Sequence, residues 1–467
     1  MRPPAKRLGG ESPLMGSNPI PSATNIKQFP KYRIWSDNKI TMKSYHIWTT
    51  GCQMNKADSE RLGSALDQMG LAPTESKEEA DVVILNTCVV RQNAENKAVG
   101  TVTSLKPQKE DNPEKVIAIM GCMVGPKTDS LKTRFPYVDV FMRPQQYQPL
   151  IDFLADRLKI DPDGCIGPLT AAPSVATFIP IIHGCDKFCS FCIIPYRRGR
   201  EKSRGISEVV HETEMLVSRG VREVTLLGQN VDSYGHDLPG KVNLADLLEA
   251  VNEVEGIKRI RFLTSHPNDM EDRIIEAVAN LPKVCEQINL PFQAGDDQVL
   301  KNMRRGYTSE EYKKLIHKIR NKVPNISLST DLIVGFCGET DSQFGNTLDM
   351  IKEIRFDKVH SAAYSTRAGT IADRQMVDDV PEQVKKDRLK EINTEQEKIV
   401  TEINSKLKGQ TQEILIEGKK QGNWFGRNRN DKLVFVNEES VRIGNLLNVQ
   451  IQETSPWYLK GSAVQSI

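Results

Sequence analysis

Residues 183–192 read His-Gly-Cys-Asp-Lys-Phe-Cys-Ser-Phe-Cys, so Cys185, Cys189 and Cys192 are spaced C-x3-C-x2-C. Three thiolates at this spacing can bind one metal centre, but they leave a tetrahedral site one ligand short. A structural zinc ion would need a fourth ligand, for which His183 is the nearest candidate. A four-iron, four-sulfur cluster held by three thiolates instead keeps one iron open to an outside ligand. The stretch therefore predicts a metal centre of one of these two kinds.

This cysteine stretch follows the first of six strand-like runs in the middle of the chain. Each run is short and apolar, and helical patterns lie between the runs. Six consecutive βα units predict an open or partial parallel barrel, because a closed eightfold barrel would need two more units. The strand-like runs are Thr177–Ile182, Glu223–Leu227, Arg259–Leu263, Gln287–Leu290, Leu328–Val334 and Lys358–Tyr364. The helical patterns include Ser207–Ser218, Leu244–Val254, Glu271–Ala279, Ser309–Arg320 and Ser342–Ile354.

Polar or glycine-rich residues follow the later runs of this barrel. Gly228-Gln229-Asn230 comes after the second run, Ser265 after the third, Gln293 after the fourth and the glycine-rich residues 335–339 after the fifth. Ligands of parallel sheets bind at the carboxyl ends of the strands. We therefore expect these loops to share one binding site with the cysteine stretch. Each polar residue taken alone could equally cap a helix or bond to loop backbone.

Three similar runs lie in the N-terminal third, and each ends just before a cysteine. Right-handed crossovers join a β-α-β-α-β pattern into a parallel sheet, whose strand ends share one edge. We therefore expect Cys52, Cys88 and Cys122 to converge and to form a second metal centre with an open position. Three unrelated buried cysteines are the alternative, since free cysteine is common in protein cores. The runs are Tyr45–Thr49, Val82–Leu85 and Val116–Met120, and the helical patterns are Asp58–Met69, with Asp58 or Ser59 as N-cap, and Ala94–Leu105.

The C-terminal segment reads as a charged helix, Pro381–Lys406, followed by short alternating strands. Short strands with Gly and Asn turns predict a small antiparallel barrel. Aromatic side chains interleaved with cations suit single-stranded or loop RNA, and a solvated β appendage is the alternative. The strands are Glu413–Ile416, Lys432–Val436, Leu447–Ile451 and Tyr458–Ala463, and the turn residues of interest are Lys419, Lys420, Trp424, Phe425, Arg427 and Arg429.

A second basic stretch lies beside the first cysteine group. Arg198 and Arg200 belong to it, and they could contact RNA phosphate or form a salt-bridged loop. The position of this stretch next to the proposed metal centre favours a role near the substrate.

The composition of the 467 residues sets further bounds. A net charge of +2 gives no overall polyanion signal, and no apolar run approaches the length of a membrane span. Nine cysteines, an odd number with several in metal-like settings, fit a reducing cytoplasm better than a disulfide framework. The start of the chain lacks the apolar core of a signal peptide, so it is expected to be disordered or to precede a start at Met42. The predicted units are an N-terminal extension, 1–42, and three domains, 43–160, 171–405 and 408–465.

The order of these units and their motifs resemble the radical S-adenosylmethionine (SAM) methylthiotransferases, from Met42 to the end of the chain. Within that family the sequence looks like the branch that makes 2-methylthio-N6-isopentenyladenosine in tRNA. The residues that carry this resemblance are Gly51-Cys52-Gln53-Met54-Asn55 with Asp58-Ser59-Glu60, Asn86-Thr87-Cys88 with Arg91 and Ala94-Glu95, and Ile194-Pro195-Tyr196 with Arg198-Gly199 and Ser203-Arg204. The branch that modifies a ribosomal protein typically has Pro-Lys in place of Gln53-Met54. Cys337 and Thr366 stand where the family usually has proline.

This resemblance implies a two-cluster mechanism. Cys185, Cys189 and Cys192 would hold a 4Fe-4S cluster that binds SAM, and residues 228–230, 265 and 293 would contact the SAM molecule. Cys52, Cys88 and Cys122 would hold an auxiliary 4Fe-4S cluster that carries the sulfur. The product would be a methylthio group on carbon 2 of an isopentenylated adenine beside the anticodon. The C-terminal barrel would be a TRAM domain that grips the anticodon stem-loop.

The resemblance also implies partners and leaves two rivals. We expect a monomeric cytoplasmic protein that receives electrons from a donor such as flavodoxin or ferredoxin and does not enter a membrane. One rival is the same chemistry on a ribosomal protein aspartate. The other is a zinc-bearing RNA-binding protein without catalysis.

Overall fold

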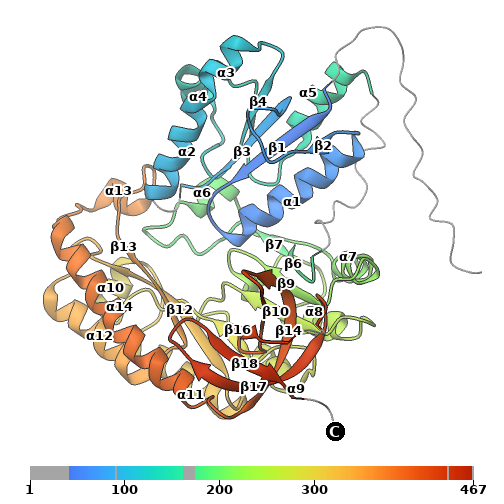
Figure 1. Ribbon diagram of the computed structural model, residues 1–467. Helices are drawn as coiled ribbons and strands as arrows, with labels where there is room; N and C mark the ends of the chain where they lie inside the picture. Colours follow the sequence, from blue (N-terminus) through green and yellow to red (C-terminus); the bar gives the residue numbers. More distant parts are fainter. Residues whose placement is uncertain (1–41, 90–91, 161–173, 439–440, 465–467) are drawn as a thin grey trace, which may run out of the picture.

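The computed structural model describes residues 42–89, 92–160, 174–438 and 441–464. The proposed N-terminal extension lies outside the described residues, except for Met42, so its expected disorder stays a prediction. In Figure 1, a blue N-terminal domain lies above a green-to-orange barrel, and a small red domain lies against the lower part of that barrel. The chain therefore has the three folded parts that the sequence predicts.

The N-terminal domain is built on a parallel sheet with the order β2-β1-β3-β4-β5 within the described residues. Its strands are β1 (Ser44–Thr49), β2 (Ala72–Pro73), β3 (Val82–Thr87), β4 (Val116–Gly121) and β5 (Val140–Met142). Helices α1 (Gln53–Gln68) and α5 (Gln148–Leu158) cover one face. The other face packs against α2 (Gln92–Ser104) and the segment containing α3 (Lys106–Asp111) and α4 (Asp129–Arg134). Because both faces are covered, every residue of β3 and β4 is buried.

The three N-terminal strands expected from the sequence are present, but the start of the first helix differs. Helix α1 begins at Gln53, with Cys52 as its N-cap, and not at Asp58 or Ser59. Asp58 and Ser59 are instead buried within the helix. The expected N-cap was wrong because a polar residue before an apolar pattern resembles a cap, even when the helix extends a full turn further. Strands β2 and β5 were not expected, because two or three residues carry too little pattern.

The central domain contains six parallel strands in chain order, in two three-stranded groups: β6-β9-β10 and β11-β12-β13. A bridge between Ile260 and Val284 joins the groups. The strands are β6 (Ala176–Pro180), β9 (Glu223–Leu227), β10 (Arg259–Leu263), β11 (Gln287–Asn289), β12 (Ser327–Val334) and β13 (Lys358–Ala363). The partial (β/α)6 barrel predicted from the sequence is therefore confirmed.

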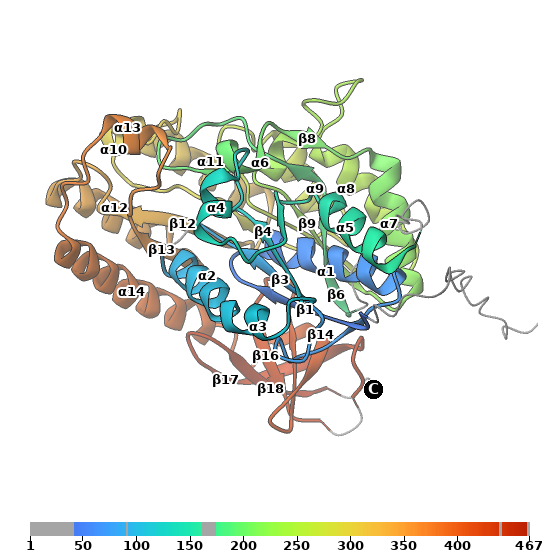
Figure 2. The same ribbon diagram turned by 90° about the horizontal axis from the view of Figure 1, so that it is seen from above.

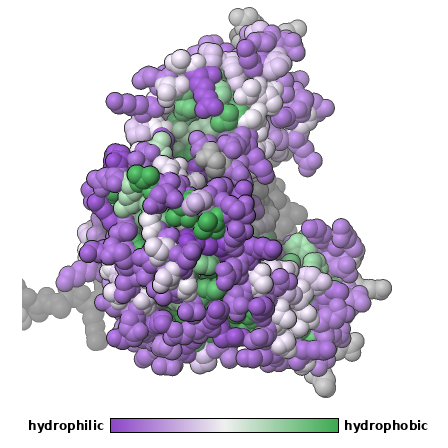
Figure 3. Space-filling model, turned by 90° about the vertical axis from the view of Figure 1, so that its left-hand side faces the viewer, coloured by the Kyte–Doolittle hydropathy of each residue, from purple (hydrophilic) through white to green (hydrophobic). Residues whose placement is uncertain are grey.

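Helices cover the outside of the barrel and bury one large apolar core (Figures 1 and 2). Asn243, Thr308 and Thr340 each form a capping box that fixes where a helix begins. The helices are α7 (Ile206–Ser218), α8 (Leu244–Asn252), α9 (Asp272–Asn280), α10 (Asp297–Asn302), α11 (Ser309–Lys322), α12 (Asp341–Ile354), α13 (Ile371–Gln375) and α14 (Glu382–Ser405). Figure 3 shows that the face bearing α13 and α14 is mostly hydrophilic, with apolar residues in small patches.

The C-terminal domain is a closed barrel in the order β14-β15-β16-β18-β17. Only the β16–β18 pair is parallel among its described strands. The strands are β14 (Thr411–Lys420), β15 (Asn423–Arg427), β16 (Leu433–Val436), β17 (Leu446–Thr454) and β18 (Leu459–Ala463). The sequence placed residues 419–429 in turns, whereas β14 runs to Lys420 and β15 occupies Asn423–Arg427. The aromatic and basic residues of β15 hide the alternation of apolar and polar side chains that indicates a strand.

Two arginines of the barrel dock this C-terminal domain. Arg259 donates to the carbonyl oxygen of Arg427 at 2.6 Å and to the Glu413 carboxylate at 2.9 Å. Arg261, two residues later on the same face of β10, donates to the carbonyl oxygens of Asn428 and Arg429 at 2.7 and 2.6 Å. Arg259 begins β10, so the small domain docks at the end of the strands opposite their carboxyl ends.

Candidate active site

The N-terminal thiol trio, Cys52, Cys88 and Cys122, lies at the carboxyl edge of the N-terminal sheet. Each cysteine follows a different strand, and the glycines beside them allow a close approach. A Cβ atom on Gly51 would lie 2.5 Å from the Cβ of Cys88, and one on Gly121 would lie 2.3 Å from the Thr87 carbonyl oxygen. Both glycines have positive φ, at 113° and 99°. The three thiols therefore come together although they are far apart in sequence.

Burial makes Cys122, one member of the N-terminal thiol trio, a weaker acid than an ordinary thiol. It raises the pKa of Cys122 to about 11, Arg198 opposes that rise, and Cys52 and Cys88 add to it. A buried thiol with such a pKa stays protonated at neutral pH unless a metal takes the place of its proton. The donor set therefore fits a group that binds thiolates directly.

The loop thiol trio, Cys185, Cys189 and Cys192, lies in one pinned loop after β6. Ser190, at its centre, accepts a bond from the backbone N–H of Ala372 and donates from its own N–H to the Met303 carbonyl oxygen at 3.0 Å. Burial raises the pKa of Cys185 to about 12 and raises that of Cys192 as well. The trio is thus held in place by the segments around α10 and α13, and Cys185 and Cys192 stay protonated at neutral pH unless a metal takes the place of the proton.

Each trio has a buried arginine beside it. The Nη1 atom of Arg305 donates to the Cys189 sulfur at 3.3 Å, and its other N–H groups bond to Pro291 and Tyr307. The Nη2 atom of Arg198 donates to Asn55 at 2.9 Å and to Asp58 at 3.2 Å, beside the N-terminal trio. The sequence did not single out Arg305, because nothing in its local pattern distinguishes a buried arginine from a solvated one.

The position of Arg198 corrects its assignment as an RNA contact. Its side chain is 1% exposed and its guanidinium is bound inside the protein. Arg429 is also wrong as an RNA contact, since its guanidinium bonds to Glu286 at 2.8 Å and to the carbonyl oxygen of Val284 at 2.6 Å. Both arginines hold domains together instead. The local sequence could not distinguish an arginine that bonds to another domain from one that binds RNA, because a positive charge suits both roles.

The other basic candidates remain nearer the surface. Arg200 is exposed and bonds to Asp186 at 2.6 Å, and Arg427 pairs with Glu417 and Asp431. Lys419 and Lys420 are exposed at the end of β14. The ammonium group of Lys419 lies 5.2 Å from the centre of the Trp424 ring, which is half-buried. These residues stay candidates for RNA contact.

The loops after the barrel strands converge on the loop thiol trio through a buried polar network. Asp269 accepts bonds at 2.6 Å from both Lys187, which lies between two of the cysteines, and Asn230. Asp232 accepts a bond from the Ser265 hydroxyl at 2.8 Å and from the His266 N–H at 3.0 Å. The sequence expected loops 228–230 and 265 to share a site with the cysteines, and these contacts bring them there.

Two polar atoms of this network are left without a hydrogen-bond partner among the described residues: Asn230 Oδ1 and His266 Nε2. Burial raises the pKa of Asp232 to about 8 and lowers the pKa of His266 to about 2. Unsatisfied buried polar atoms at such a site are available to a bound polar ligand. Gly228 leaves no room for a side chain, because its Cβ would lie 2.5 Å from Ile182, and Gln293 has a positive φ of 69°.

The segments that carry the two trios pack against each other at the interface between the first two domains. Cys122 packs in one apolar cluster with Ile193, which directly follows the last cysteine of the loop trio. On the other side, Met54 of α1 packs against Leu227 of the barrel. The ion pair from Arg61 of α1 to Glu212 of α7, at 2.6 Å, adds to this contact. Cys122 and the residue that follows Cys192 therefore lie together at this interface.

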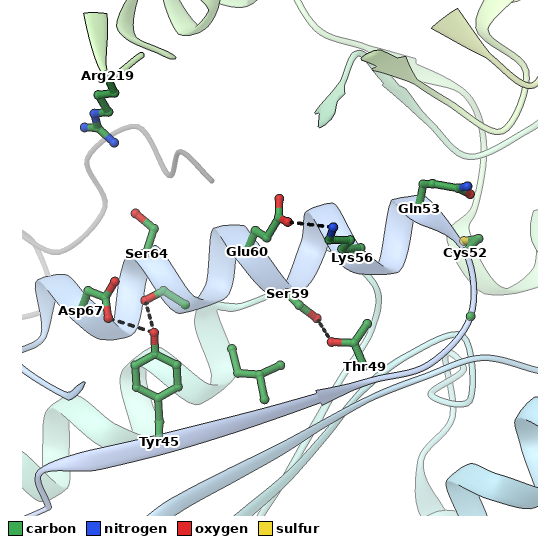
Figure 4. Close-up of a pocket in the computed structure, with 13 residues that line it drawn as sticks. Tyr45, Thr49, Cys52, Gln53, Lys56, Ser59, Glu60, Ser64, Asp67 and Arg219 are labelled. Carbon is green, nitrogen blue, oxygen red and sulfur yellow. Dashed lines mark hydrogen bonds and ion pairs between the residues drawn. The ribbon is translucent and has the colours of Figure 1, made fainter. Parts of the chain in front are cut away.

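A cleft of about 740 Å³ runs along α1 from Cys52 towards Asp67 (Figure 4). Cys52 is exposed at one end of it, whereas Cys88 and Cys122 are buried. The N-terminal trio is thus reached from the side of Cys52. The polar side chains along the cleft are Gln53, Lys56, Ser59, Glu60, Ser64, Asp67 and Arg219.

Within the described residues, no three His, Cys, Asp or Glu side chains are arranged to hold a single metal ion. A structural zinc site needs four ligands, so three thiols leave it one ligand short, whereas a 4Fe-4S cluster can be held by three thiolates. Among the described helices, none is long and apolar enough to cross a membrane.

Comparison with known proteins adds three family matches and several relatives. Residues 44–143 match an uncharacterized protein family, UPF0004, residues 179–351 match the radical SAM superfamily, and residues 405–464 match the TRAM domain. The chain is 48% identical, over 91% of its length and 99% of the relative, to a tRNA-2-methylthio-N(6)-dimethylallyladenosine synthase of Dehalococcoides mccartyi. It is 42% identical, over 93% and 95%, to the synthase of that name from Thermoanaerobacter pseudethanolicus.

Among solved structures, the chain is similar in fold to the radical S-adenosylmethionine methyltransferase TsrM from Kitasatospora setae, which binds cobalamin and a [4Fe-4S] cluster. The TM-score is 0.52, at 13% identity, over 71% of this chain and 74% of that one. This likeness shows a shared fold over the matched part of each chain.

Proposed function

Since the chain belongs to the tRNA-2-methylthio-N(6)-dimethylallyladenosine synthase family, we propose that its two thiol trios hold the two 4Fe-4S clusters of a tRNA methylthiotransferase. The enzyme adds a methylthio group to carbon 2 of N6-dimethylallyladenosine in tRNA, using SAM and radical chemistry. Cys185, Cys189 and Cys192 are assigned to the radical SAM cluster, and Cys52, Cys88 and Cys122 to the auxiliary cluster. The observation that supports this assignment is that Cys122 packs in one apolar cluster with Ile193, which directly follows Cys192.

The clusters and SAM supply the one-electron chemistry, the sulfur and the methyl group, none of which an amino-acid side chain can provide. The residues of the chain supply position and exclusion of water. Ser190 fixes the loop trio between α10 and α13, and the glycines of the N-terminal trio let three strand ends approach closely. The apolar contacts around Cys122 keep water away from that buried thiol.

The SAM contacts are proposed to come from the buried polar network of the barrel. Asn230 has a carbonyl oxygen that is free to accept a bond from the ligand, and His266 offers a ring nitrogen. Ser265 is already bonded to Asp232 and therefore shapes the site through that carboxyl group. Gly228 gives the ligand room close to the backbone, and Gln229 and Gln293 complete the proposed set.

The C-terminal TRAM barrel is proposed to grip the anticodon stem-loop through Lys419, Lys420 and Trp424, with Arg427 beside them. An aromatic ring flanked by cations suits base stacking plus phosphate contact. Arg200 would contribute a phosphate contact from the barrel. The TRAM match and the tRNA-modifying relatives support this binding partner.

The electron donor, compartment and assembly state are further proposals. A small electron-transfer protein such as flavodoxin or ferredoxin would have to deliver electrons, because the side chains of the chain store none. None of the described cysteines forms a disulfide, which supports a reducing cytoplasm. The chain is proposed to act as a monomer.

The function is tested with tRNA that carries dimethylallyladenosine, by mass spectrometry of nucleosides after incubation with the reconstituted enzyme, SAM and a reductant. Appearance of the 2-methylthio nucleoside is expected. A ribosomal protein with its target aspartate serves as the competing acceptor, and modification of that protein instead would overturn the assignment.

A further inference from the structure

Arg198 links the two cysteine-bearing parts of the molecule. It ends the short helix α6 (Ile194–Arg198), which begins two residues after Cys192. Its guanidinium nevertheless lies in the other domain, where it bonds to Asn55 and Asp58 of α1. A residue of the loop trio's own segment thus reaches the N-terminal trio.

The bonds to α1 satisfy only one nitrogen of this guanidinium. Nε and Nη1 of Arg198 are buried and have no hydrogen-bond partner among the described residues. Leaving charged N–H donors buried without acceptors is costly, so such a group usually has an acceptor in the working protein. The ion pair with Asp58 alone does not account for these two donors.

The missing acceptor is indicated by what lies beside the guanidinium. The positive charge of Arg198 acts on Cys122 and Cys52. Cys122 is 1% exposed and the Arg198 side chain is 1% exposed, so little solvent separates or screens them. Sulfur atoms held at this trio would therefore be placed to accept the free N–H groups.

A fixed positive charge changes the redox balance of such a cluster. A 4Fe-4S core bound by three thiolates is anionic, and it gains one more negative charge on one-electron reduction. A neighbouring guanidinium stabilises the reduced form more than the oxidised form. Net charge and hydrogen bonds to sulfur are among the factors that set the potential of these clusters.

We propose that Arg198 is a positioning residue of the auxiliary cluster: its buried guanidinium donates to cluster sulfur at the N-terminal trio and raises the reduction potential of that cluster. This inference rests on the proposed assignment of a cluster to Cys52, Cys88 and Cys122. It goes beyond that assignment, because it gives a residue of the barrel domain a direct part in tuning a centre held by the other domain.

The test uses the full chain with Cys185, Cys189 and Cys192 changed to Ala, so that only the N-terminal trio can be loaded. After anaerobic reconstitution, the midpoint potential is measured by redox titration with dithionite, followed by electron paramagnetic resonance. Arg198→Gln is expected to shift the midpoint to a lower value. Arg198→Lys keeps the positive charge but has fewer N–H donors, arranged differently. Its midpoint potential is expected to lie between those of wild type and Arg198→Gln.

Arg259→Gln is the matched control, because Arg259 is equally buried and paired with a carboxylate but lies at the opposite end of the barrel strands. It is expected to keep the wild-type midpoint. An unchanged midpoint in a loaded Arg198→Gln variant would overturn the inference. A second pair of results would also overturn the inference: Arg198→Gln loses iron, and Arg198→Lys keeps the wild-type midpoint potential. Arg198 would then have only a structural role. Failure of the parent triple variant to bind iron would contradict the cluster assignment instead.

Discussion

The two thiol trios have the same composition but are assembled in opposite ways. The loop trio comes from eight consecutive residues, and its geometry is fixed by local turns and by bonds through Ser190. The N-terminal trio comes from three separate strand ends, and it exists only when the sheet has formed. A local site is therefore visible as a spacing in the sequence, whereas a distributed site is visible only through the topology that gathers it.

The two arginines beside the trios differ in the same way. Arg305 reaches Cys189 with all of its nitrogens bonded. Arg198 reaches the other trio across a domain interface and keeps two nitrogens unbonded. The distributed trio therefore depends on a contact from another domain as well as on its own sheet.

The largest expected effect separates the two trios by their metal content. Reconstituted wild type is expected to hold about eight irons per chain, and either triple alanine variant about four. The variant at Cys52, Cys88 and Cys122 should still cleave SAM reductively, whereas the variant at Cys185, Cys189 and Cys192 should not. Iron, acid-labile sulfide and 5′-deoxyadenosine are measured. If wild type and the variant at Cys185, Cys189 and Cys192 both held about four irons per chain, the assignment of a cluster to the loop trio would be wrong.

Adding one methyl group at a glycine should break each trio separately. Gly121→Ala places a Cβ 2.3 Å from the Thr87 carbonyl oxygen, and Gly184→Ala places one 2.0 Å from that of Arg200, both at positive φ. Each is expected to lower the free energy of unfolding by about 1–3 kcal/mol and to reduce iron at its own trio. Gly100→Ala, in helix α2 with open space around it, is the control and should be neutral or slightly stabilising. Equal iron loss at both trios would contradict independent assembly.

Removing the arginine of the loop trio should cost stability as well as cluster binding. Arg305→Gln leaves the Pro291 carbonyl oxygen and the Tyr307 hydroxyl short of a partner in a buried setting. A loss of about 2 kcal/mol in the free energy of unfolding is expected from chemical denaturation. Arg305→Lys should recover part of this lost free energy of unfolding. Iron at the N-terminal trio is the internal comparison, and it should be unaffected.

A pH dependence should reveal the buried carboxyl group near the loop trio. Asp232 bonds to the Ser265 hydroxyl and to a backbone N–H, and burial raises its pKa from 3.8 to about 8. The folded state then binds the proton more tightly, so this group's contribution to stability falls as pH rises from about 4 to about 8. Asp232→Asn should remove a slope of at most about 1.4 kcal/mol per pH unit. Denaturation of the SAM-free protein across this range measures it, and identical slopes in variant and wild type would refute the shift.

The smallest expected effect lies outside both trios, on the C-terminal barrel. Lys420→Ala should weaken tRNA binding modestly and reduce the slope of log affinity against log salt by about one, as loss of one phosphate contact does. Lys398→Ala, on the exposed side of α14, is the control. Binding is measured at several salt concentrations. An unchanged slope for Lys420→Ala would remove that lysine from the RNA surface, without bearing on either trio.

Much of the barrel could be predicted because its strands are long enough to show a pattern. The bounds of β9 and β10 were predicted correctly, and the helix after each capping box began within two residues of its expected start. Strands β2, β5 and β15 were missed. Two of them are very short, and the third has basic and aromatic side chains that resemble a binding turn.

The sequence by itself determined the chemistry available to this protein. Cysteine spacing and the position of each cysteine after a strand are properties of the chain, so two thiol trios and a partial barrel followed from them. Only the tertiary structure decided which charged side chains serve those trios. Arg198, Arg305 and Arg429 look alike in sequence, because an arginine's role depends on the partners that folding brings to it. Burial and domain docking turned Arg198 from a proposed RNA contact into a neighbour of Cys122, and no local pattern encodes that contact.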